Sequence, residues 1–146
     1  MIATLLILAA AFSVSLSARC DGDWMQYGDK CYKFLPEQDR WEFQITRCMY
    51  QGATLAGINN HEENEVIRSL TDGRDIYLGL CTTFGRNWHW IDQSPYDYRN
   101  WKNGAEPMVT RSRPCGIMTS DGKWTNACCV YHPSPVVCVK SANQNW

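Results

Sequence analysis

The chain has 146 residues, which is room for one domain of ordinary size. Its 14 Lys and Arg residues nearly balance 15 Asp and Glu residues, so the formal net charge is −1 at pH 7. This balance gives no electrostatic argument for nucleic acid or for an anionic membrane, and we expect neither as a partner.

Residues 1–18, MIATLLILAAAFSVSLSA, hold no charged side chain and end in small residues suited to cleavage near Ala18. This pattern predicts a secretory signal peptide. A membrane anchor is the alternative, but the apolar core is well short of the ~20 residues that span a bilayer. We therefore expect a secreted, extracellular protein without a membrane span, whose single domain covers residues 19–146.

Eight cysteines follow this leader. An even number in a chain expected to enter an oxidising compartment favours four disulfides over a metal cluster. The number of cysteines does not by itself determine which of them pair.

The first predicted element is a short hairpin in CDGDWMQYGDKCYKF, residues 20–34, with its turn around Gly28. A helix is predicted next in DRWEFQITRCMYQG, residues 39–52, where Asp39 and Glu42 are spaced as a capping box and Gly52 as a stop. The residues at helical spacing, expected to form its buried face, are Trp41, Ile45, Cys48 and Met49.

A second helix is predicted in NNHEENEVIRSLTDG, residues 59–73. Asn60 can cap its first turn, and Gly73 can end it. The residues expected to face the core are Val66, Ile67 and Leu70.

After Gly73 the sequence changes to short strand-like segments separated by turns rich in Gly, Pro, Asn, Asp and Ser. These segments are DIYLGL (75–80), NWHWI (87–91), CGIMT (115–119), KWTNA (123–127) and VVCVK (136–140). Helices first and strands afterwards predict an α+β domain.

Four stretches carry a resemblance to a known family: YLGL (77–80), WHWIDQSPYDYRNW (88–101), EPM (106–108) and GKWTNACC (122–129). They are similar to the W-I-G-L, W-x-D-G-S…Y-x-N-W, E-P-N and G-x-W-N-D-x-x-C motifs of the C-type lectin-like domain. The order of the elements resembles the long form of that domain, from Cys20 to Cys138. The resemblance implies a disulfide-rich fold in which two helices pack on short antiparallel sheets beside a long loop region.

The resemblance also implies three disulfides: Cys20–Cys31, Cys48–Cys138 and Cys115–Cys129. Cys81 and Cys128 remain, and the even number of cysteines predicts that they form a fourth bridge. An exchange of roles between Cys128 and Cys129 stays open. A redox or metal-binding pair is disfavoured, because neither a Cys-x-x-Cys motif nor a basic cluster is present to activate a thiolate.

In sugar-binding members of the family, a calcium ion lies between the E-P-N loop and the W-N-D strand. Glu106 matches the first acid of that site, but Met108 replaces the Asn and Arg113 stands where a second acid is usual. Thr125 and Asn126 replace the Asn and Asp of W-N-D. Ca²⁺ requires oxygen ligands with offsetting charge, so we expect no metal and no cofactor here. These five residues remain the candidate ligand-binding site.

The sequence leaves three further questions open. The family holds the bond before its E-P-N proline in cis, whereas an ordinary turn would leave Pro107 trans. Arg113 either pairs with Glu106 in place of the ion or is a solvated surface charge. Four tryptophans are expected in the core rather than on a sugar-stacking face: Trp88, Trp90, Trp101 and Trp124.

No catalytic constellation is apparent, since the three histidines lack metal-ligand spacing and the acidic residues resemble turn residues. The sequence therefore predicts a binding module rather than an enzyme. Its ligand would be an extracellular glycan or protein, bound through the long loops of residues 82–114 without the usual calcium bridge. The alternative is a genuine carbohydrate-binding lectin, with altered calcium geometry or with direct hydrogen bonds from Glu106, Thr125 and Asn126.

Overall fold

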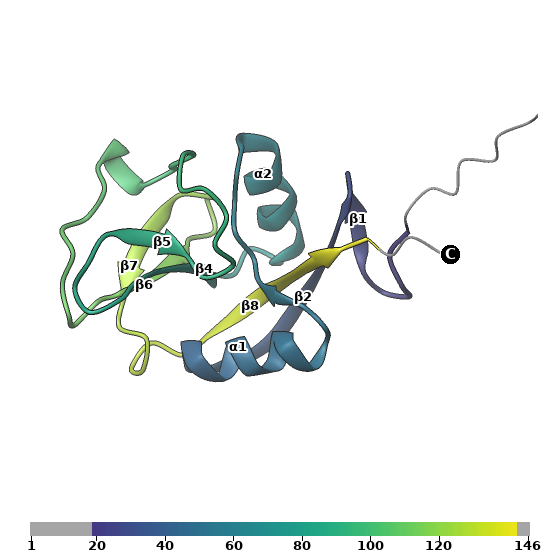
Figure 1. Ribbon diagram of the computed structural model, residues 1–146, viewed down its shortest axis with the longest axis horizontal. Coiled ribbons are helices and arrows are strands. Elements are labelled where there is room, and N and C mark those ends of the chain that lie inside the picture. The colour runs from purple at the N-terminus through teal and green to yellow at the C-terminus, as the bar shows by residue number, and fades with distance from the viewer. Residues whose placement is uncertain (1–18, 143–146) are drawn as a thin grey trace, which may run out of the picture.

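The computed structural model describes residues 19–142, so the predicted signal peptide lies outside the described residues. Within them, two helices pack on one mixed sheet, which confirms the α+β prediction (Figure 1). In chain order the elements are β1 (Met25–Tyr27), β2 (Lys30–Asp39), α1 (Trp41–Tyr50), β3 (Thr54–Leu55), α2 (His61–Leu70), β4 (Ile76–Thr82), β5 (Trp88–Trp90), the short 3-10 helix η1 (Lys102–Gly104), β6 (Cys115–Met118), β7 (Trp124–Ala127) and β8 (Ser134–Ser141).

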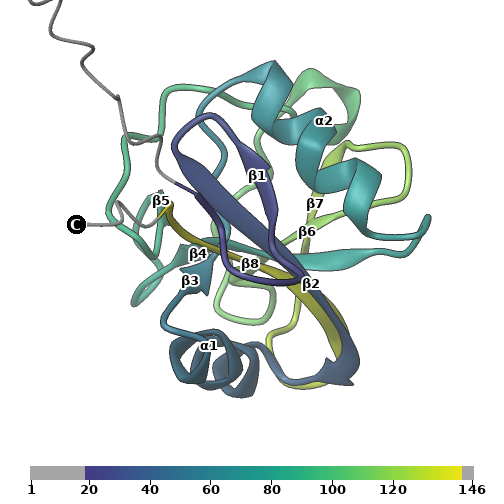
Figure 2. The same ribbon diagram turned by 90° about the vertical axis from the view of Figure 1, so that its right-hand side faces the viewer.

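The sheet has the strand order β1-β2-β8-β4-β6-β7, with β3 added to β8 and β5 to β4. The last strand, β8, therefore lies in the middle of the sheet, antiparallel to β2 and parallel to β4. The two helices lie on opposite sides of the β2–β8 ladder (Figures 1 and 2). Strands β4 to β7 and the long loops form the end of the molecule away from β1. None of the helices between residues 19 and 142 is long and apolar enough to cross a membrane.

Helix α1 begins and packs differently from the prediction. The expected capping box does not form, because Asp39 accepts a hydrogen bond from the backbone N–H of Arg40 (2.8 Å) and pairs with Arg47 (2.8 Å). Met49, expected to be buried, is 66% exposed. Gln44 is buried instead, where its Nε2 donates to the carbonyl oxygens of Glu37 and Ser134, each at 2.7 Å.

Helix α2 follows the prediction closely. The side chain of Asn60 accepts a hydrogen bond from the backbone N–H of Glu63 (2.8 Å), as an N-cap should. Ile67 is buried, and Val66 and Leu70 pack partly buried against the main core.

Three of the four expected disulfides are present: Cys20–Cys31, Cys48–Cys138 and Cys115–Cys129. The fourth prediction is wrong, since Cys81 and Cys128 are both free thiols. Strand register explains this, because Cys81 lies opposite Cys115 and Cys115 lies opposite Ala127. Cys128 is therefore about two strand spacings from Cys81, roughly 10 Å, and a disulfide needs Cα atoms within about 7 Å.

The four tryptophans lie in the core, as expected. Each is at most 4% exposed. Their rings contact one another in the order Trp88, Trp101, Trp124 and Trp90, with one tilted and two edge-to-face contacts. Trp124 also donates its Nε1–H to Asn64 Oδ1 of α2 (2.8 Å). The tryptophans therefore fasten the long loops to the domain.

Candidate functional site

The five candidate residues come from three segments at the end of the domain that carries β4 to β7 (Figure 1). Glu106 and Met108 follow η1, Arg113 precedes β6, and Thr125 and Asn126 are in β7. Two of the five make direct contact with each other, namely Arg113 and Asn126.

Glu106 is already engaged by side chains of its own loop. Its Oε2 accepts a hydrogen bond from the Tyr96 hydroxyl (2.9 Å) and pairs with Arg99 Nε (3.2 Å). Tyr96 in turn accepts a hydrogen bond from Trp101 Nε1 (2.7 Å), and burial raises the pKa of Tyr96 to about 12. The phenol therefore stays protonated and donates to the carboxylate over the physiological pH range.

Arg113 binds β7 rather than Glu106. Its Nε (3.2 Å) and Nη2 (2.6 Å) donate to the main-chain carbonyl oxygen of Asn126, and Asn126 Nδ2 donates back to the carbonyl oxygen of Arg113 (3.3 Å). The hypothesis of an Arg113–Glu106 pair is therefore wrong. The guanidinium is exposed, yet it holds the end of the loop against the strand.

The E-P-M turn is anchored through its backbone. The Trp88 indole donates its Nε1–H to the carbonyl oxygen of Pro107 (3.2 Å), and the bond before Pro107 is trans. Met108 is 85% exposed at the tip of this turn. An apolar thioether therefore stands at the position where the family motif has an amide.

These residues do not fit a calcium ion. Ca²⁺ takes about 6 to 8 oxygen ligands, several of them carboxylates. Glu106 is the one carboxylate among the five candidates, and Arg99 already neutralises it. Arg113 adds a second cation beside Asn126, whose side chain is a neutral amide.

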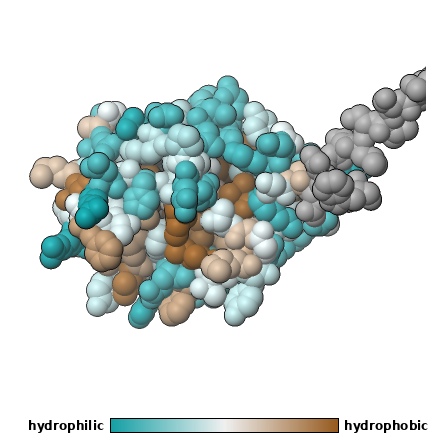
Figure 3. Space-filling view, in the orientation of Figure 1, coloured by the Kyte–Doolittle hydropathy of each residue, from teal (hydrophilic) through white to brown (hydrophobic). Residues whose placement is uncertain are grey.

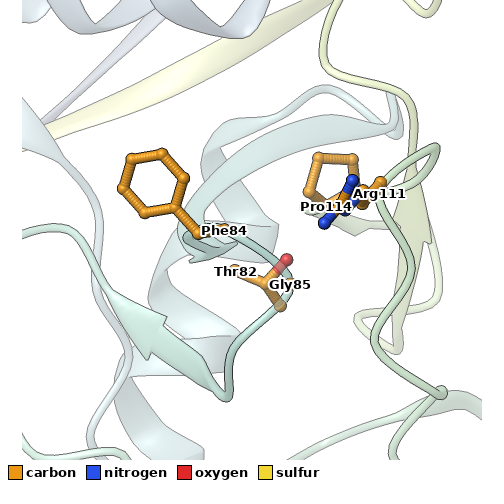
Figure 4. A pocket seen from close by; sticks show the side chains of 5 residues that line it. All are labelled: Thr82, Phe84, Gly85, Arg111 and Pro114. Atoms are coloured by element: carbon orange, nitrogen blue, oxygen red, sulfur yellow. The ribbon is translucent and has the colours of Figure 1, made fainter.

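Besides a hollow of about 350 Å³ lined by residues that include Arg99, Glu106 and Lys123, two hollows open on this end of the molecule. The first, the Glu106 hollow, has a volume of about 310 Å³ and is lined by residues that include Trp101, Asn103, Glu106, Pro107 and Thr125. The second, the Phe84 hollow, has a volume of about 430 Å³ and is lined by Thr82, Phe84, Gly85, Arg111 and Pro114 (Figure 4). In the orientation of Figure 1, hydrophilic side chains cover the region of α2 while apolar ones gather near the middle of the surface (Figure 3).

Sequence reasoning missed Tyr96, Arg99 and the Phe84 hollow. Tyr96 and Arg99 lie between β5 and η1, where the backbone is irregular and no periodic pattern indicates which side chains meet. The one available signal was charge, because Arg99 precedes Glu106 by seven residues in the same loop.

Comparison with known proteins agrees with this geometry. The family model described as "Lectin C-type domain" matches residues 37–140, so the chain belongs to the C-type lectin domain family. Members of this family are binding proteins, and the chain is accordingly a binding protein and not an enzyme.

The chain matches part of the length of a similar protein. Ladderlectin of Oncorhynchus mykiss is 31% identical over 119 residues, which are 76% of this chain and 63% of ladderlectin, so the chain spans less than two thirds of that relative.

Solved structures of C-type lectin-like domains have the same fold as this chain. A calcium-independent type II antifreeze protein superimposes with a TM-score of 0.80 at 26% identity, covering 87% of this chain and 98% of that protein. The C-type carbohydrate-recognition domain of cow CD23, solved with a GlcNAc2Man3 oligosaccharide, gives 0.79 at 26% identity, covering 87% and 99%.

Proposed function

We propose that this protein is a secreted, extracellular binding protein that recognises its ligand through the long loops of residues 82–114 and the adjoining strand β7, without a calcium bridge. The observation that carries the proposal is the ion pair between Glu106 and Arg99. This exposed ion pair already engages one oxygen of the carboxylate that a bridging cation would need.

Electrostatics supports the same conclusion. Glu106 contributes one negative charge to the site, while Arg99 and Arg113 contribute two positive charges. A divalent cation entering this region would have to break the Arg99 pair and would then meet a net repulsion. Similarity to the calcium-independent type II antifreeze protein supports a fold that persists without the ion.

Secretion is supported by two features of the chain. Residues 1–18 have the pattern of a signal peptide. Three disulfides connect residues as far apart as Cys48 and Cys138, and such bridges persist in oxidising compartments.

The test is a binding screen of the purified protein against glycan and protein arrays, run in calcium and again in chelator. We expect the same ligands with the same affinities in both buffers. Loss of all binding in chelator, restored by calcium, would exclude the proposal.

A carbohydrate ligand held by direct hydrogen bonds is the second candidate. It is favoured by the Glu106 hollow, where a carboxylate, the Asn103 amide and the Thr125 hydroxyl lie around one concave surface. The structural likeness to the CD23 carbohydrate-recognition domain also supports it. Thr125→Val should then weaken retention on a glycan column in chelator. Thr46→Val, at an exposed threonine of α1 that lines neither hollow, should not.

A further inference from the structure

The Phe84 hollow lies in a part of the domain that is locally basic although the whole chain is slightly acidic. The two segments that flank it, residues 82–91 and 107–118, contain three arginines and no Asp or Glu. Among residues 19–142, neither Arg86 nor Arg111 forms an ion pair. Two unpaired guanidinium groups are therefore available to an anion at this end of the molecule.

A tight turn builds one wall of the hollow. Phe84 (φ 53°) and Gly85 (φ 69°) both adopt left-handed backbone conformations, and the N–H of Arg86 donates to the carbonyl oxygen of Thr83 (3.0 Å). This turn leaves the Phe84 ring 90% exposed. A non-glycine residue at positive φ is uncommon, and such conformations are concentrated at binding sites.

The opposite wall is held in register with the turn. The N–H of Thr82 donates to the carbonyl oxygen of Pro114 (2.8 Å), which fixes the spacing between the two segments. Phe84 and Arg111 lie on either side of the hollow, with Thr82 and Gly85 between them (Figure 4). An aromatic residue and an arginine thus line one concave space.

The side chain of Thr82 leaves one polar atom unsatisfied in the lining of the hollow. Thr82 is 8% exposed and lines the hollow, yet its Oγ1 has no hydrogen-bond partner among the described residues. Buried hydroxyls in native proteins nearly always have a partner. Because this oxygen is shielded from solvent, a ligand in the hollow does not reach it in this conformation.

We propose that the Phe84 hollow binds an anionic saccharide, with its sulfate or carboxylate on Arg111 and a sugar ring against Phe84. Guanidinium groups bind such planar or tetrahedral oxyanions with two parallel hydrogen bonds. The flat apolar ring offers the C–H face of a pyranose a large contact surface at low conformational cost. Arg86, on the same turn, adds long-range attraction. This inference rests on the proposed function and names the ligand class for it.

The experiment is a calorimetric titration of the protein in chelator with a heparin-derived tetrasaccharide and with its desulfated counterpart. A second pair, 3′-sialyllactose and lactose, distinguishes sulfate from carboxylate as the source of the anion. We expect the charged member of at least one pair to bind and its neutral counterpart to bind at least about tenfold more weakly, as loss of one charge-assisted contact implies.

Two variants with matched controls localise the binding. Arg111→Gln and Phe84→Ala should each weaken it about tenfold. Arg40→Gln removes the same charge at the N-cap of α1, and Tyr50→Ala removes an aromatic ring that is 87% exposed on the same helix. Neither control residue lines the Phe84 hollow, so neither should change the affinity. All four side chains are exposed, and the variants should fold normally.

Thr82→Val tests the floor of the hollow. It should raise the melting temperature of the free protein, because it removes an unsatisfied hydroxyl. It should leave saccharide binding unchanged, because the removed oxygen is not open to the hollow. The inference is overturned if no anionic saccharide binds, or if Arg40→Gln weakens binding as much as Arg111→Gln. If an anionic saccharide binds equally well in chelator and in calcium but Arg111→Gln does not weaken the binding, the Phe84 hollow is not its site. The proposed function would then still stand. Binding that requires calcium would reject the proposed function itself.

Discussion

Arg113 donates two hydrogen bonds to the carbonyl oxygen of Asn126, and Asn126 returns one to the carbonyl oxygen of Arg113. Arg113, at the position where the resemblance to the family implies an acid, thus fastens the segment before β6 to strand β7. The loop that calcium would otherwise organise is held by the protein's own side chains.

Removing that fastening should loosen the loop without unfolding the domain. We expect Arg113→Ala to lower the free energy of unfolding by about 1 kcal/mol, a value limited by the exposure of the guanidinium. Urea titration measures this loss, and hydrogen exchange should become faster in residues 109–114. Arg86→Ala is the control, since Arg86 is exposed and forms no ion pair among the described residues, so its effect should be close to zero. Equal losses in the two variants would contradict the role of Arg113.

Calcium should not change the melting temperature of the native protein. A site of micromolar affinity would add about 4 kcal/mol at millimolar calcium, an effect easily seen by differential scanning calorimetry. A rise in melting temperature that chelator reverses and Glu106→Ala abolishes would contradict this expectation.

A calcium site should instead be recoverable by design. Four substitutions restore the family's ligand types: Met108→Asn, Arg113→Glu, Thr125→Asn and Asn126→Asp. Because Arg99 occupies Glu106, adding Arg99→Gln to this set should strengthen the calcium-induced rise in melting temperature. Arg113→Glu alone should give none. An identical response with and without Arg99→Gln would show that the ion pair does not compete with calcium.

Thiol titration should find two free cysteines in the unfolded, unreduced protein and one in the native state. Burial raises the pKa of Cys81 to about 11, so this thiol stays protonated and shielded. Backbone N–H groups of Tyr131 and Val130, and then Arg113, hold the pKa of Cys128 below its ordinary value. The thiolate reacts, and a lowered pKa keeps it populated as the pH falls. The alkylation midpoint of Cys128 should therefore lie below that of a free cysteine.

The control for that measurement is Cys81→Ser, which should leave the native reactivity of Cys128 unchanged and reduce the unfolded protein to one thiol. Finding no thiols in the unfolded wild type would restore the fourth bridge and contradict the strand register.

Helix α2 offers a test of local structure. Asn60→Ala should destabilise the protein by about 1 kcal/mol, because the backbone N–H of Glu63 loses its partner. Asn60→Asp keeps the acceptor and should be nearly neutral. Chemical denaturation of both variants measures the difference, and equal losses would show that the cap contributes nothing.

Local signals in the sequence predicted most of the fold. Asn60 and the apolar spacing after it identified α2, and short strand-like segments between turn-rich stretches identified most of the strands. At α1 a tertiary interaction overrode the local signal, because Asp39 pairs with Arg47 instead of capping. Burial of Gln44 depends on carbonyl groups at both ends of the chain, which no local pattern reveals.

The candidate site was harder to predict for two physical reasons. Motif spacing located Glu106 and Arg113 but not their partners, since contacts inside an irregular loop follow no period. The even number of cysteines predicted a bridge between Cys81 and Cys128, but only strand register shows that one strand separates them. Composition cannot supply that distance.

The central place of β8 in the sheet has a consequence for the order of events during synthesis. Strands β2, β3 and β4 all pair with β8, so each lacks a neighbour until residues 134–141 have left the ribosome. Contacts between distant parts of a chain form slowly, and unpaired strands are exposed in the meantime. The strands that precede β8 must therefore be protected until residues 134–141 have emerged, and Cys48 must wait for Cys138 before their bridge can form.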